Sequence, residues 1–442
     1  MARPSATRSL TIWMNGVPVG TWTLGRNIAH TFAYDDSWLT SPAARPISLS
    51  MPLRPAAAPY RGSLVEAWFD NLLPDSPTIR SRIQARFGAA SGRAFDLLAE
   101  VGRDCVGAVQ LLPEGVQPTG IDRIEGEPLD DEAVADILRN TPAMTGIGRA
   151  DHEEFRISLA GAQEKTALLR HDGQWYRPSG ATPSTHIFKL PMGRVGNMQA
   201  DFSTSVENEW LCAQLVRAFG LPVADCEIVK FRDQKALVVT RFDRRLAQTG
   251  KHWLRLPQED LCQATGTPPA LKYESDGGPG IQQTMDLLLG SIEPDRDREH
   301  FFKAQLVFWM LCATDGHAKN FSVRLLPGGG YRMTPLYDVL SAHPILGHKA
   351  GQLAPEKAKL AMAAISKNRH YAWTRILPRH WDSTARACGL SETSARAIRI
   401  ELAERAPDIV SSVAADLPAE FPEGLAASIF AGMEHAARRL AN

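Results

Sequence analysis

The stretch that decides the fold is residues 313–320, with the sequence ATDGHAKN. It places Asp315 and Asn320 in one loop, and Asp338 follows within the segment LYDV at residues 336–339. An aspartate, an asparagine and a second aspartate after a hairpin-length gap is the order in which protein kinases arrange a catalytic base and two magnesium ligands. The pattern therefore indicates phosphoryl-transfer chemistry.

The three side chains suit that chemistry. Transfer of a γ-phosphate needs an oriented hydroxyl and a metal ion that bridges phosphate oxygens. Asp315 would accept or orient the hydroxyl proton, whereas Asn320 and Asp338 would supply the oxygen ligands that Mg²⁺ prefers. The alternative for the loop alone is a polar surface turn, because Asp-Gly and Lys-Asn are ordinary turn dipeptides. The surrounding sequence favours the catalytic interpretation.

The residues around this loop predict a buried helix before it and a hairpin after it. In residues 301–313 the apolar side chains recur at helical spacing, at Phe302, Leu306, Trp309, Met310 and Ala313. Residues 321–325 alternate in polarity, as in a strand, and residues 327–330 (PGGG) form a turn. Residues 331–333 then form the second strand of a hairpin. Such a hairpin would bring Asp338 back toward Asn320.

Two upstream features are candidates for phosphate contacts. Residues 156–166 form a small-residue turn before the apolar strand 167–169, and such a turn can present backbone N–H groups to phosphates. It carries a single glycine, so an ordinary hairpin is the alternative. Lys189 lies in an apolar strand, where a lysine often only extends its amine to water. Because it follows the turn by about one hairpin, it is better read as the lysine that holds the α- and β-phosphates.

A helix is expected to begin near Ser205 and to carry Glu207 and Glu209 in its first turns. One of them would pair with Lys189, as a helix glutamate does in protein kinases. Acidic residues are also ordinary partners of a helix N-terminus, and the sequence does not choose between the two glutamates.

Several longer motifs carry a resemblance to a known family. They are residues 157–169 (ISLAGAQEKTALL), 255–260 (RLPQED), 272–280 (KYESDGGPG) and 314–322 (TDGHAKNFS), with 69–76 (FDNLLPDS), 95–98 (FDLL) and 102–104 (GRD) in the N-terminal part. Together they closely resemble the HipA toxin kinases of bacteria. The likeness extends over nearly the whole chain and is looser in its C-terminal third.

The resemblance implies an α+β fold. We expect a two-lobed protein-kinase-like structure, with a small mixed lobe and a helical large lobe, and an additional N-terminal α/β subdomain. The expected divisions are a HipA-type subdomain of a β-hairpin plus helices at 1–115, a linker and helix at 116–150, a kinase N-lobe-like region with phosphate loop and hinge at 151–262, and a helical C-lobe with the catalytic loop at 263–442.

The resemblance also implies a function. The expected activity is that of an ATP- and Mg²⁺-dependent serine/threonine kinase toxin that inactivates a translation factor, such as an aminoacyl-tRNA synthetase, with glutamyl-tRNA synthetase the first guess. Growth would stop. A helix-turn-helix, HipB-like antitoxin dimer would neutralise the toxin and would provide most of the contact with operator DNA. Autophosphorylation of Ser158 would inactivate the kinase.

The site residues follow by the same analogy. Glu259 to Leu261 would form the adenine-contacting hinge, and Asp315 would be the catalytic residue. The residues expected to contact the nucleotide are Ala160, Gly161, Ala162, Gln163, Glu164, Lys165, Lys189, Glu259, Asp260, Leu261, His317, Ala318, Lys319, Asn320, Tyr337 and Asp338. Asn320 and Asp338 would also bind the metal.

Two other functions compete with this one. The first alternative is a corepressor scaffold that binds an antitoxin–DNA complex. The second is a kinase for a small molecule, since kinase-like folds share the same spacing of catalytic base and metal ligands. The scaffold is not expected to be the sole role, because the residues expected for catalysis and nucleotide binding are all present: Asp315, Asn320, Asp338 and Lys189. The N-terminal region and the Ser158 loop favour the toxin over the small-molecule kinase.

Composition agrees with a cytoplasmic enzyme of two or three domains. The 442 residues contain 49 Lys+Arg and 49 Asp+Glu, so the chain lacks the basic excess of an autonomous DNA-binding protein. The six cysteines form no C-x-x-C pair and the twelve histidines no H-E-x-x-H, which predicts buried reduced thiols and no such metal motif. We expect no membrane span, because no apolar run approaches about 20 residues.

The remaining pattern gives a coarse order of elements. A β-hairpin is expected at 10–24, helices near 63–99, and a Gly/Pro-rich segment at 113–127. Strands should dominate 155–242, with 236–242 leading to the hinge. After about residue 300 we expect mainly helix, interrupted by the hairpin after Asn320, with Ser391 as the N-cap of a helix over 391–406.

Overall fold

The computed structural model describes residues 7–27, 29–142, 158–161, 163–196 and 198–441. The chain folds into two compact units. Unit 1 contains Met1–Leu190, Lys230–Ala270 and Val323–Tyr331, and unit 2 contains Pro191–Val229, Leu271–Ser322 and Arg332–Asn442.

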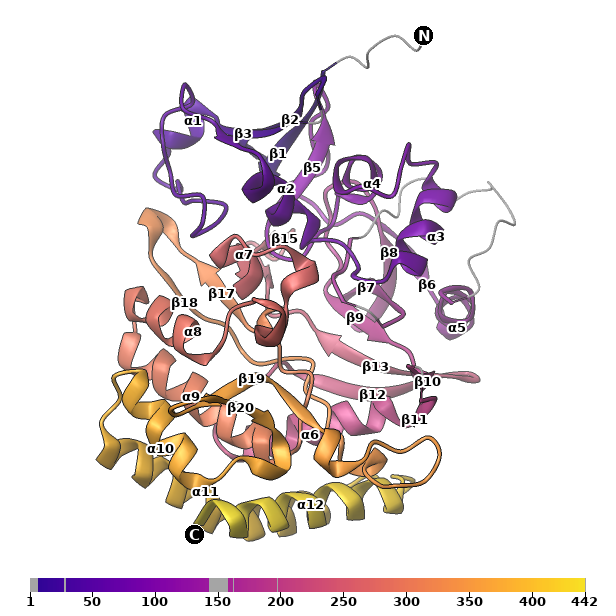
Figure 1. Ribbon diagram of the computed structural model, residues 1–442. Helices are drawn as coiled ribbons and strands as arrows, with labels where there is room; N and C mark the ends of the chain where they lie inside the picture. The colour runs from indigo at the N-terminus through magenta and orange to yellow at the C-terminus, as the bar shows by residue number, and fades with distance from the viewer. Residues whose placement is uncertain (1–6, 28, 143–157, 162, 197, 442) are drawn as a thin grey trace. The chain divides into compact units, whose positions relative to one another are not determined.

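Unit 1 begins with an antiparallel sheet in the order β4-β3-β2-β1-β5 (Figure 1). Its strands are β1 (Arg8–Met14), β2 (Val17–Leu24), β3 (His30–Tyr34), β4 (Tyr60–Arg61) and β5 (Val109–Pro113). Asn15 and Gly16 join β1 to β2 with φ values of 49° and 82°, the positive pair that a tight hairpin turn requires. The predicted N-terminal hairpin is therefore confirmed, within a sheet whose other strands the sequence pattern did not reveal.

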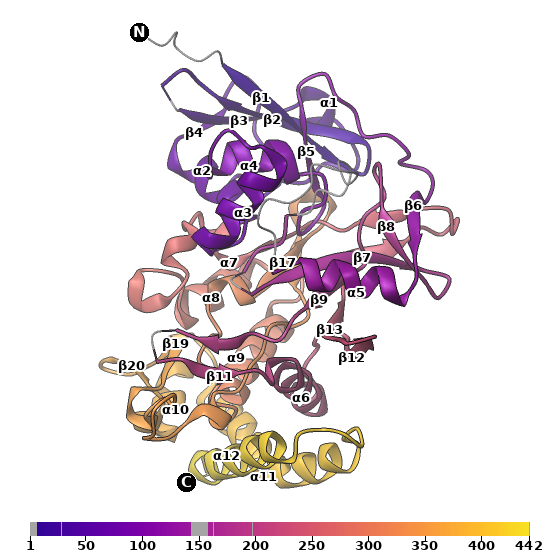
Figure 2. The ribbon, with the colours of Figure 1, turned by 90° about the vertical axis from the view of Figure 1, so that its right-hand side faces the viewer.

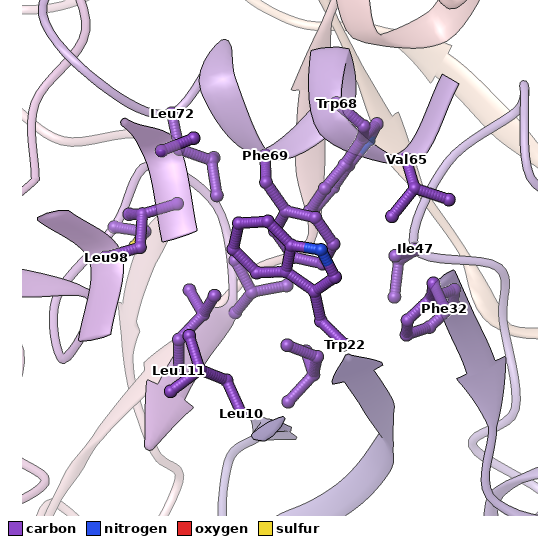
Figure 3. Packing of buried hydrophobic residues seen from close by; sticks show 14 of the residues in the cluster. Leu10, Trp22, Phe32, Ile47, Val65, Trp68, Phe69, Leu72, Leu98 and Leu111 are labelled. Atoms are coloured by element: carbon purple, nitrogen blue, oxygen red, sulfur yellow. The ribbon is translucent and has the colours of Figure 1, made fainter. Parts of the chain in front are cut away.

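Helices pack against this sheet and close its core. Those that contact the sheet are α1 (Asp36–Leu39), α2 (Ser63–Asp70) and α4 (Ala94–Val101), and α3 (Pro77–Phe87) packs on α4. Helices α2, α3 and α4 confirm the helices expected near 63–99. Trp22 of β2 stacks on Phe69 of α2 with ring centroids 3.9 Å apart and planes 7° apart. Figure 3 shows Trp22 surrounded by Leu10 and Leu111 from the sheet and by Trp68 and Phe69 from α2. Burial of these large rings fixes α2 on the sheet.

A second sheet carries the predicted phosphate loop and lysine strand. Its order is β12-β13-β9-β7-β8-β6, and its strands are β6 (Gly126–Leu129), β7 (Lys165–His171), β8 (Gln174–Pro178), β9 (His186–Lys189), β12 (Cys226–Phe231) and β13 (Gln234–Thr240). Helix α5 (Asp131–Asn140) contacts β6 and β13. Strands therefore do dominate the described part of 155–242. The segment 116–150 contributes a strand as well as a helix, because β6 pairs with β8.

Shorter elements follow the second sheet. They are β14 (Arg244–Leu246), β15 (Trp253–Arg255), β16 (Gln258–Asp260), α7 (Leu261–Thr265), β17 (Ser322–Leu325), η5 (Pro327–Gly329) and β18 (Tyr331–Met333). Strands β16, β17 and β18 form one sheet in that order. The hairpin predicted after Asn320 is thus present.

Unit 2 is built mainly of helices. The longer ones are α6 (Ser205–Ala218), α8 (Ile281–Leu287), α9 (Pro294–Met310), α10 (Pro378–Ala387), α11 (Glu392–Ala415) and α12 (Glu423–Ala441). The 3₁₀ turns are η1 (Pro269–Leu271), η2 (Glu274–Asp276), η3 (Leu288–Gly290), η4 (Ala318–Asn320), η6 (His343–Ile345), η7 (Pro355–Lys357) and η8 (Trp373–Arg375), of which η1 begins in unit 1. Both views show α11 and α12 side by side (Figure 2).

Two helix predictions in this unit are confirmed. Helix α9 is buried along most of its length from Phe301 onward, and it ends just before the loop that carries Asp315. Helix α11 has Ser391 as its N-cap, whose side chain accepts a hydrogen bond from the Ser394 amide, as predicted. The helix runs past residue 406, through Pro407, to Ala415.

The prediction of mainly helix after residue 300 is wrong for one segment. Strands β19 (Lys359–Ile365) and β20 (Arg369–Ala372) form a second hairpin there, and β10 (Gly193–Val195) pairs with β11 (Ala200–Phe202) elsewhere in the unit. The sequence of β19 is KLAMAAI, rich in good helix formers and almost wholly buried. Pairing and burial overrode that local preference, which periodicity alone cannot reveal.

The cysteines behave as expected. All six are free thiols, five of them buried and Cys226 partly exposed. Within the described ranges, no helix combines the length and the apolar character that a membrane span requires.

Candidate active site

Ser158 is held inside unit 1 at two points. Its amide donates to the Asp104 carbonyl at 3.1 Å and its hydroxyl donates to the Leu72 carbonyl at 2.8 Å. The residue is fully buried. The sequence placed a serine beside the phosphate loop but gave no sign of this burial. In this conformation the hydroxyl is not accessible to a phosphate donor.

Asp104 fixes that anchor through a buried ion cluster. Its carboxylate lies 2.9 Å from Arg244, 3.3 Å from Arg255 and 3.5 Å from Arg241. Burial alone would raise the pKa of Asp104, but the three guanidinium groups outweigh it and hold the pKa well below its usual range. A charge cluster of this kind is costly to disturb, so the Asp104 carbonyl is a rigid acceptor for Ser158.

The loop after Ser158 is stabilised by its own lysine. Gly161 has φ +104°, in the region that favours glycine, and its carbonyl accepts from the Asp75 amide at 3.2 Å. The Lys165 ammonium donates to the Ala160 carbonyl at 2.9 Å. A Cβ on Gly161 would meet the flexible end of the Lys165 side chain, 2.5 Å from its ammonium nitrogen, so it is the positive φ that favours glycine here.

Two other predicted residues of this loop, Gln163 and Glu164, make contacts within unit 1. Gln163 donates to the Leu190 carbonyl at 2.6 Å, and Glu164 forms an ion pair with Arg82. Both side chains thus take part in holding the loop. Ala162, and the motif residues before Ser158, lie outside the described residues.

Lys165 and Lys189 occupy directly opposed positions. Lys165 on β7 pairs with Lys189 on β9 in the antiparallel register, so both side chains leave the same face of the sheet. Lys189 is 7% exposed. Like charges at opposed positions of a sheet require compensation from neighbouring groups, and the Lys165 ammonium donates to the Ala160 carbonyl at 2.9 Å. The sequence indicated each lysine separately, but the register that joins them depends on the fold.

The predicted hinge uses its side chains to hold the fold. Glu259 accepts from the Leu49 amide at 2.7 Å and from the Trp68 indole at 3.1 Å, and burial raises its pKa to about 8. Asp260 caps α7 by accepting from the Gln263 amide at 2.8 Å. Leu261 is the first residue of α7 and is buried. Any adenine contact of this segment therefore falls mainly to its backbone.

In unit 2 the predicted catalytic loop, residues 313–320, presents Asp315 to solvent. Its side chain is 60% exposed. One carboxylate oxygen accepts a hydrogen bond from the Tyr273 hydroxyl, and the Asp315 carbonyl accepts from the Asn320 side-chain amide at 2.8 Å. Both the carboxylate and the backbone of Asp315 are therefore oriented, while the carboxylate stays accessible.

The rest of the loop is buried and tied to a neighbouring segment. The Ala318 amide donates to the Lys272 carbonyl at 3.2 Å, and the Asn320 amide donates to the His317 carbonyl at 2.9 Å. His317, Ala318, Lys319 and Asn320 are all buried. A rigid backbone under an exposed carboxylate is what an oriented catalytic group requires.

Tyr337 joins Asp338 to this loop. Its hydroxyl donates to the Lys319 carbonyl at 2.9 Å and is hydrogen-bonded to the Ser322 hydroxyl at 2.5 Å. Asp338 itself has φ 60°, a conformation that few residues other than glycine adopt. The Tyr337 contacts bring the chain next to Asp338 back to the residues that flank Asn320, as the predicted hairpin requires.

Asn320 and Asp338 fit a magnesium ion. The side-chain nitrogen of Asn320 is used by the Asp315 carbonyl, so its carboxamide oxygen is the atom suited to a metal. A neutral and an anionic oxygen are ligands that Mg²⁺ accepts, together with phosphate oxygens and water. Across the described ranges, no group of three or more His, Cys, Asp or Glu could hold a metal ion.

Glu207 and Glu209 are both buried in α6. Helix α6 belongs to unit 2 and Lys189 to unit 1. That one of the two glutamates pairs with Lys189 stays a prediction, and so does the alternative that they are partners of the helix N-terminus.

Sequence reasoning missed Tyr273 as a residue of the candidate site. It lies in the motif at 272–280 that contributed to the family resemblance, but no role followed from the pattern. Its contact with Asp315 joins residues far apart in the chain, and a single tyrosine in a glycine-rich segment gives no signal of such a partner.

Comparison with known proteins decides the family. The HipA N-terminal domain model matches residues 10–112, and the model of the HipA-like C-terminal domain matches residues 157–410. The chain belongs to the HipA family. This confirms the resemblance drawn from the motifs, whereas the domain boundaries at 115, 150 and 262 stay predictions.

Relatives of this chain carry the names of kinases or putative kinases. The putative kinase Y4mE of Sinorhizobium fredii is 36% identical over 361 residues, covering 80% of this chain and 82% of the relative. The serine/threonine-protein kinase toxin HipA of Shewanella oneidensis is 28% identical over 326 residues, covering 71% of this chain and 70% of the relative. The chain is accordingly a serine/threonine kinase of the HipA family.

A solved structure confirms the fold. Shewanella oneidensis HipA, in a complex with HipB and its operator DNA, matches this chain with a TM-score of 0.79 and 23% identity, and the match covers 97% of each chain. The predicted kinase-like α+β fold is correct.

Proposed function

We propose that this HipA-family kinase uses ATP and Mg²⁺ to phosphorylate a serine or threonine of a translation factor, and so acts as a toxin. The observation that carries the proposal is the exposed Asp315 carboxylate, oriented by Tyr273 and tied through its carbonyl to Asn320. An accessible carboxylate on a rigid loop suits the transfer of a proton from a substrate hydroxyl.

The proposed reaction assigns each group a task. Asp315 orients the substrate hydroxyl and accepts its proton as the hydroxyl oxygen bonds to the γ-phosphorus and the bond to the β–γ bridging oxygen breaks, releasing ADP. Lys165 and Lys189 hold phosphate oxygens. Asn320 and Asp338 hold Mg²⁺, which when bound neutralises the charge that develops on the phosphates. The backbone of Glu259 to Leu261 contacts adenine.

The proposed substrate is an aminoacyl-tRNA synthetase, with glutamyl-tRNA synthetase the first choice. The test incubates the protein with Mg-ATP and a panel of purified synthetases, and then locates phosphate by mass spectrometry. Phosphate at one site in one synthetase, with loss of its aminoacylation activity, is expected. Phosphate in no protein, with ATP consumed when sugars or antibiotics are added, would favour a small-molecule kinase. No ATP turnover at all would favour the corepressor scaffold.

We also predict that an antitoxin provides the DNA contact. The support is the balance of 49 basic and 49 acidic residues, together with the relative that was solved with HipB and operator DNA. In gel-shift assays at physiological salt, the isolated chain should show little specific affinity for its operator, and addition of a helix-turn-helix antitoxin dimer should produce a ternary complex. Sequence-specific binding by the chain alone at about nanomolar concentration would contradict this.

A further prediction is that Ser158 is a self-inactivation switch. Phosphorylation adds a charge of about −1.5 to −2, which a buried residue between the Asp104 and Leu72 carbonyls cannot keep. The modified segment should leave this position and carry the adjoining Ala160–Lys165 loop out of its nucleotide-binding form. Wild type incubated with Mg-ATP should therefore gain one phosphate at Ser158 and lose ATP affinity.

The controls for this switch are two variants. Asp315→Asn should gain no phosphate at Ser158, and Ser158→Ala should keep ATP affinity after the same incubation. The measurement is ATP titration of phosphorylated and unmodified protein, separated by ion exchange. Equal affinity of the two forms would disprove the switch, even if Ser158 is modified.

A further inference from the structure

Residues 271–280 form a strap that reaches the catalytic loop; we call them the Tyr273 strap. The Tyr273 hydroxyl donates to the Asp315 carboxylate. The ring of Tyr273 meets the ring of His317 edge to face, with centroids 5.0 Å apart and planes 85° apart. The backbone adds a third contact, from the Ala318 amide to the Lys272 carbonyl. The strap is therefore attached to the loop by a hydroxyl, a ring and a main-chain hydrogen bond.

The other side of the strap is fixed to the β19–β20 hairpin. The Glu274 carboxylate accepts from the Ala363 amide of β19 at 2.6 Å and forms an ion pair with Arg369 of β20. Glu274 is buried, so these partners hold it firmly. Tyr273 is thus placed between a fixed residue and the catalytic loop.

Glycines allow the strap to fold this tightly. A Cβ on Gly280 would lie 2.2 Å from the Glu274 carboxyl carbon, and a Cβ on Gly278 would lie 2.0 Å from the Leu271 carbonyl oxygen. Gly277 has φ +102°, a conformation that other residues rarely adopt. The glycine-rich composition of the strap therefore serves the position of Tyr273 and Glu274.

We propose that Tyr273 is a positioning residue for the Asp315 carboxylate. The proposal rests on the proposed function, and it adds the group that sets the carboxylate's orientation. Aspartate rotates easily about its last side-chain bond, and an exposed carboxylate samples many orientations. A hydrogen bond from a fixed tyrosine holds one oxygen in place and directs the other oxygen to the substrate hydroxyl. Asn320 fixes the backbone of the same residue, so the two contacts are complementary.

The expected effect is a loss in the rate of the chemical step. Misplacement of a catalytic group by about 1 Å can cost about 10²-fold. The Tyr273→Phe variant keeps the ring against His317 and removes the hydroxyl. It should lower kcat by about 10- to 100-fold, while the KM for ATP and the Kd for Mg-ATP stay within about twofold of wild type. The melting temperature should not change measurably.

The experiment compares five proteins in one radiolabelled phosphoryl-transfer assay. Wild type, Tyr273→Phe, Asp315→Ala and the double variant form a cycle, and Tyr371→Phe, a tyrosine of β20, is the matched control. Rates are normalised to the fraction of each protein that binds Mg-ATP, so loss of folding cannot imitate loss of positioning. In the Asp315→Ala background, removal of the hydroxyl should change the rate by less than about twofold, because the partner is already absent.

Three results would overturn the proposal. The first is a kcat of Tyr273→Phe close to that of wild type. The second is a kcat above that of wild type, which would mean that the tyrosine competes with the substrate hydroxyl for Asp315. The third is a loss of rate on removing the Tyr273 hydroxyl that is equally large in the Asp315→Ala background. Each requires an active wild type. An inactive wild type with every synthetase tested would instead count against the proposed function, so the two failures are distinguishable.

Discussion

Replacing Asp315 by asparagine is expected to slow phosphoryl transfer by about 10² to 10⁴-fold. Asparagine has nearly the same shape and can still accept the hydrogen bond from Tyr273, but it cannot take the proton of a substrate hydroxyl. The side chain is exposed and its backbone contacts do not involve the carboxylate, so the fold should be unchanged. Initial rates with saturating Mg-ATP, together with the melting temperature, test both statements.

The matched control is Asp408→Asn, which changes an exposed aspartate of α11 in the same unit. It should keep the wild-type rate. If Asp315→Asn retained activity within about threefold of wild type, the assignment of Asp315 would be lost, because removal of a catalytic base costs far more.

Replacing Asp338 by asparagine is expected to abolish transfer by a different route. Asn, like Asp, tolerates the left-handed conformation seen at φ 60°, so the local backbone should persist. The anionic metal ligand is lost, however, and changes even in the groups around metal ligands cost about 10- to 100-fold in metal affinity. The variant should need much more Mg²⁺ for any activity and should bind Mg-ATP more weakly.

The measurement is ATP titration by calorimetry with and without Mg²⁺. Binding of metal-free ATP should be the same in wild type and Asp338→Asn, and the gain in ATP affinity on adding Mg²⁺ should be much smaller in the variant. An unchanged Mg²⁺ dependence in the variant would remove Asp338 from the metal site.

Local features of the fold were predictable because local sequence determines them. The hairpin at Asn15-Gly16, the helix that ends before the catalytic loop and the cap at Ser391 each depend on neighbours in the chain. The β19–β20 hairpin was missed because the helix formers of KLAMAAI were placed in a strand by pairing and burial. Contacts such as Trp68 with Glu259 connect distant residues and leave no periodic signal.

The candidate site shows the same division. Asp315, Asn320 and Asp338 could be proposed as site residues from their order alone, because protein kinases arrange these residue types in that order. The opposition of Lys165 and Lys189, the burial of Ser158 and the contact of Tyr273 with Asp315 depend on strand register and on long-range packing. None of these three is encoded in a short motif.

The central claim is that this chain transfers the γ-phosphate of ATP to protein hydroxyls through Asp315. The most direct test incubates wild type and Asp315→Asn with ATP that carries a radiolabelled γ-phosphate, Mg²⁺ and the synthetase panel, and then measures covalent label on serine and threonine. Label that appears with wild type and is lost with Asp315→Asn is the predicted result. Label that is absent from every protein in the wild-type reaction, or equal with both enzymes, would contradict the claim.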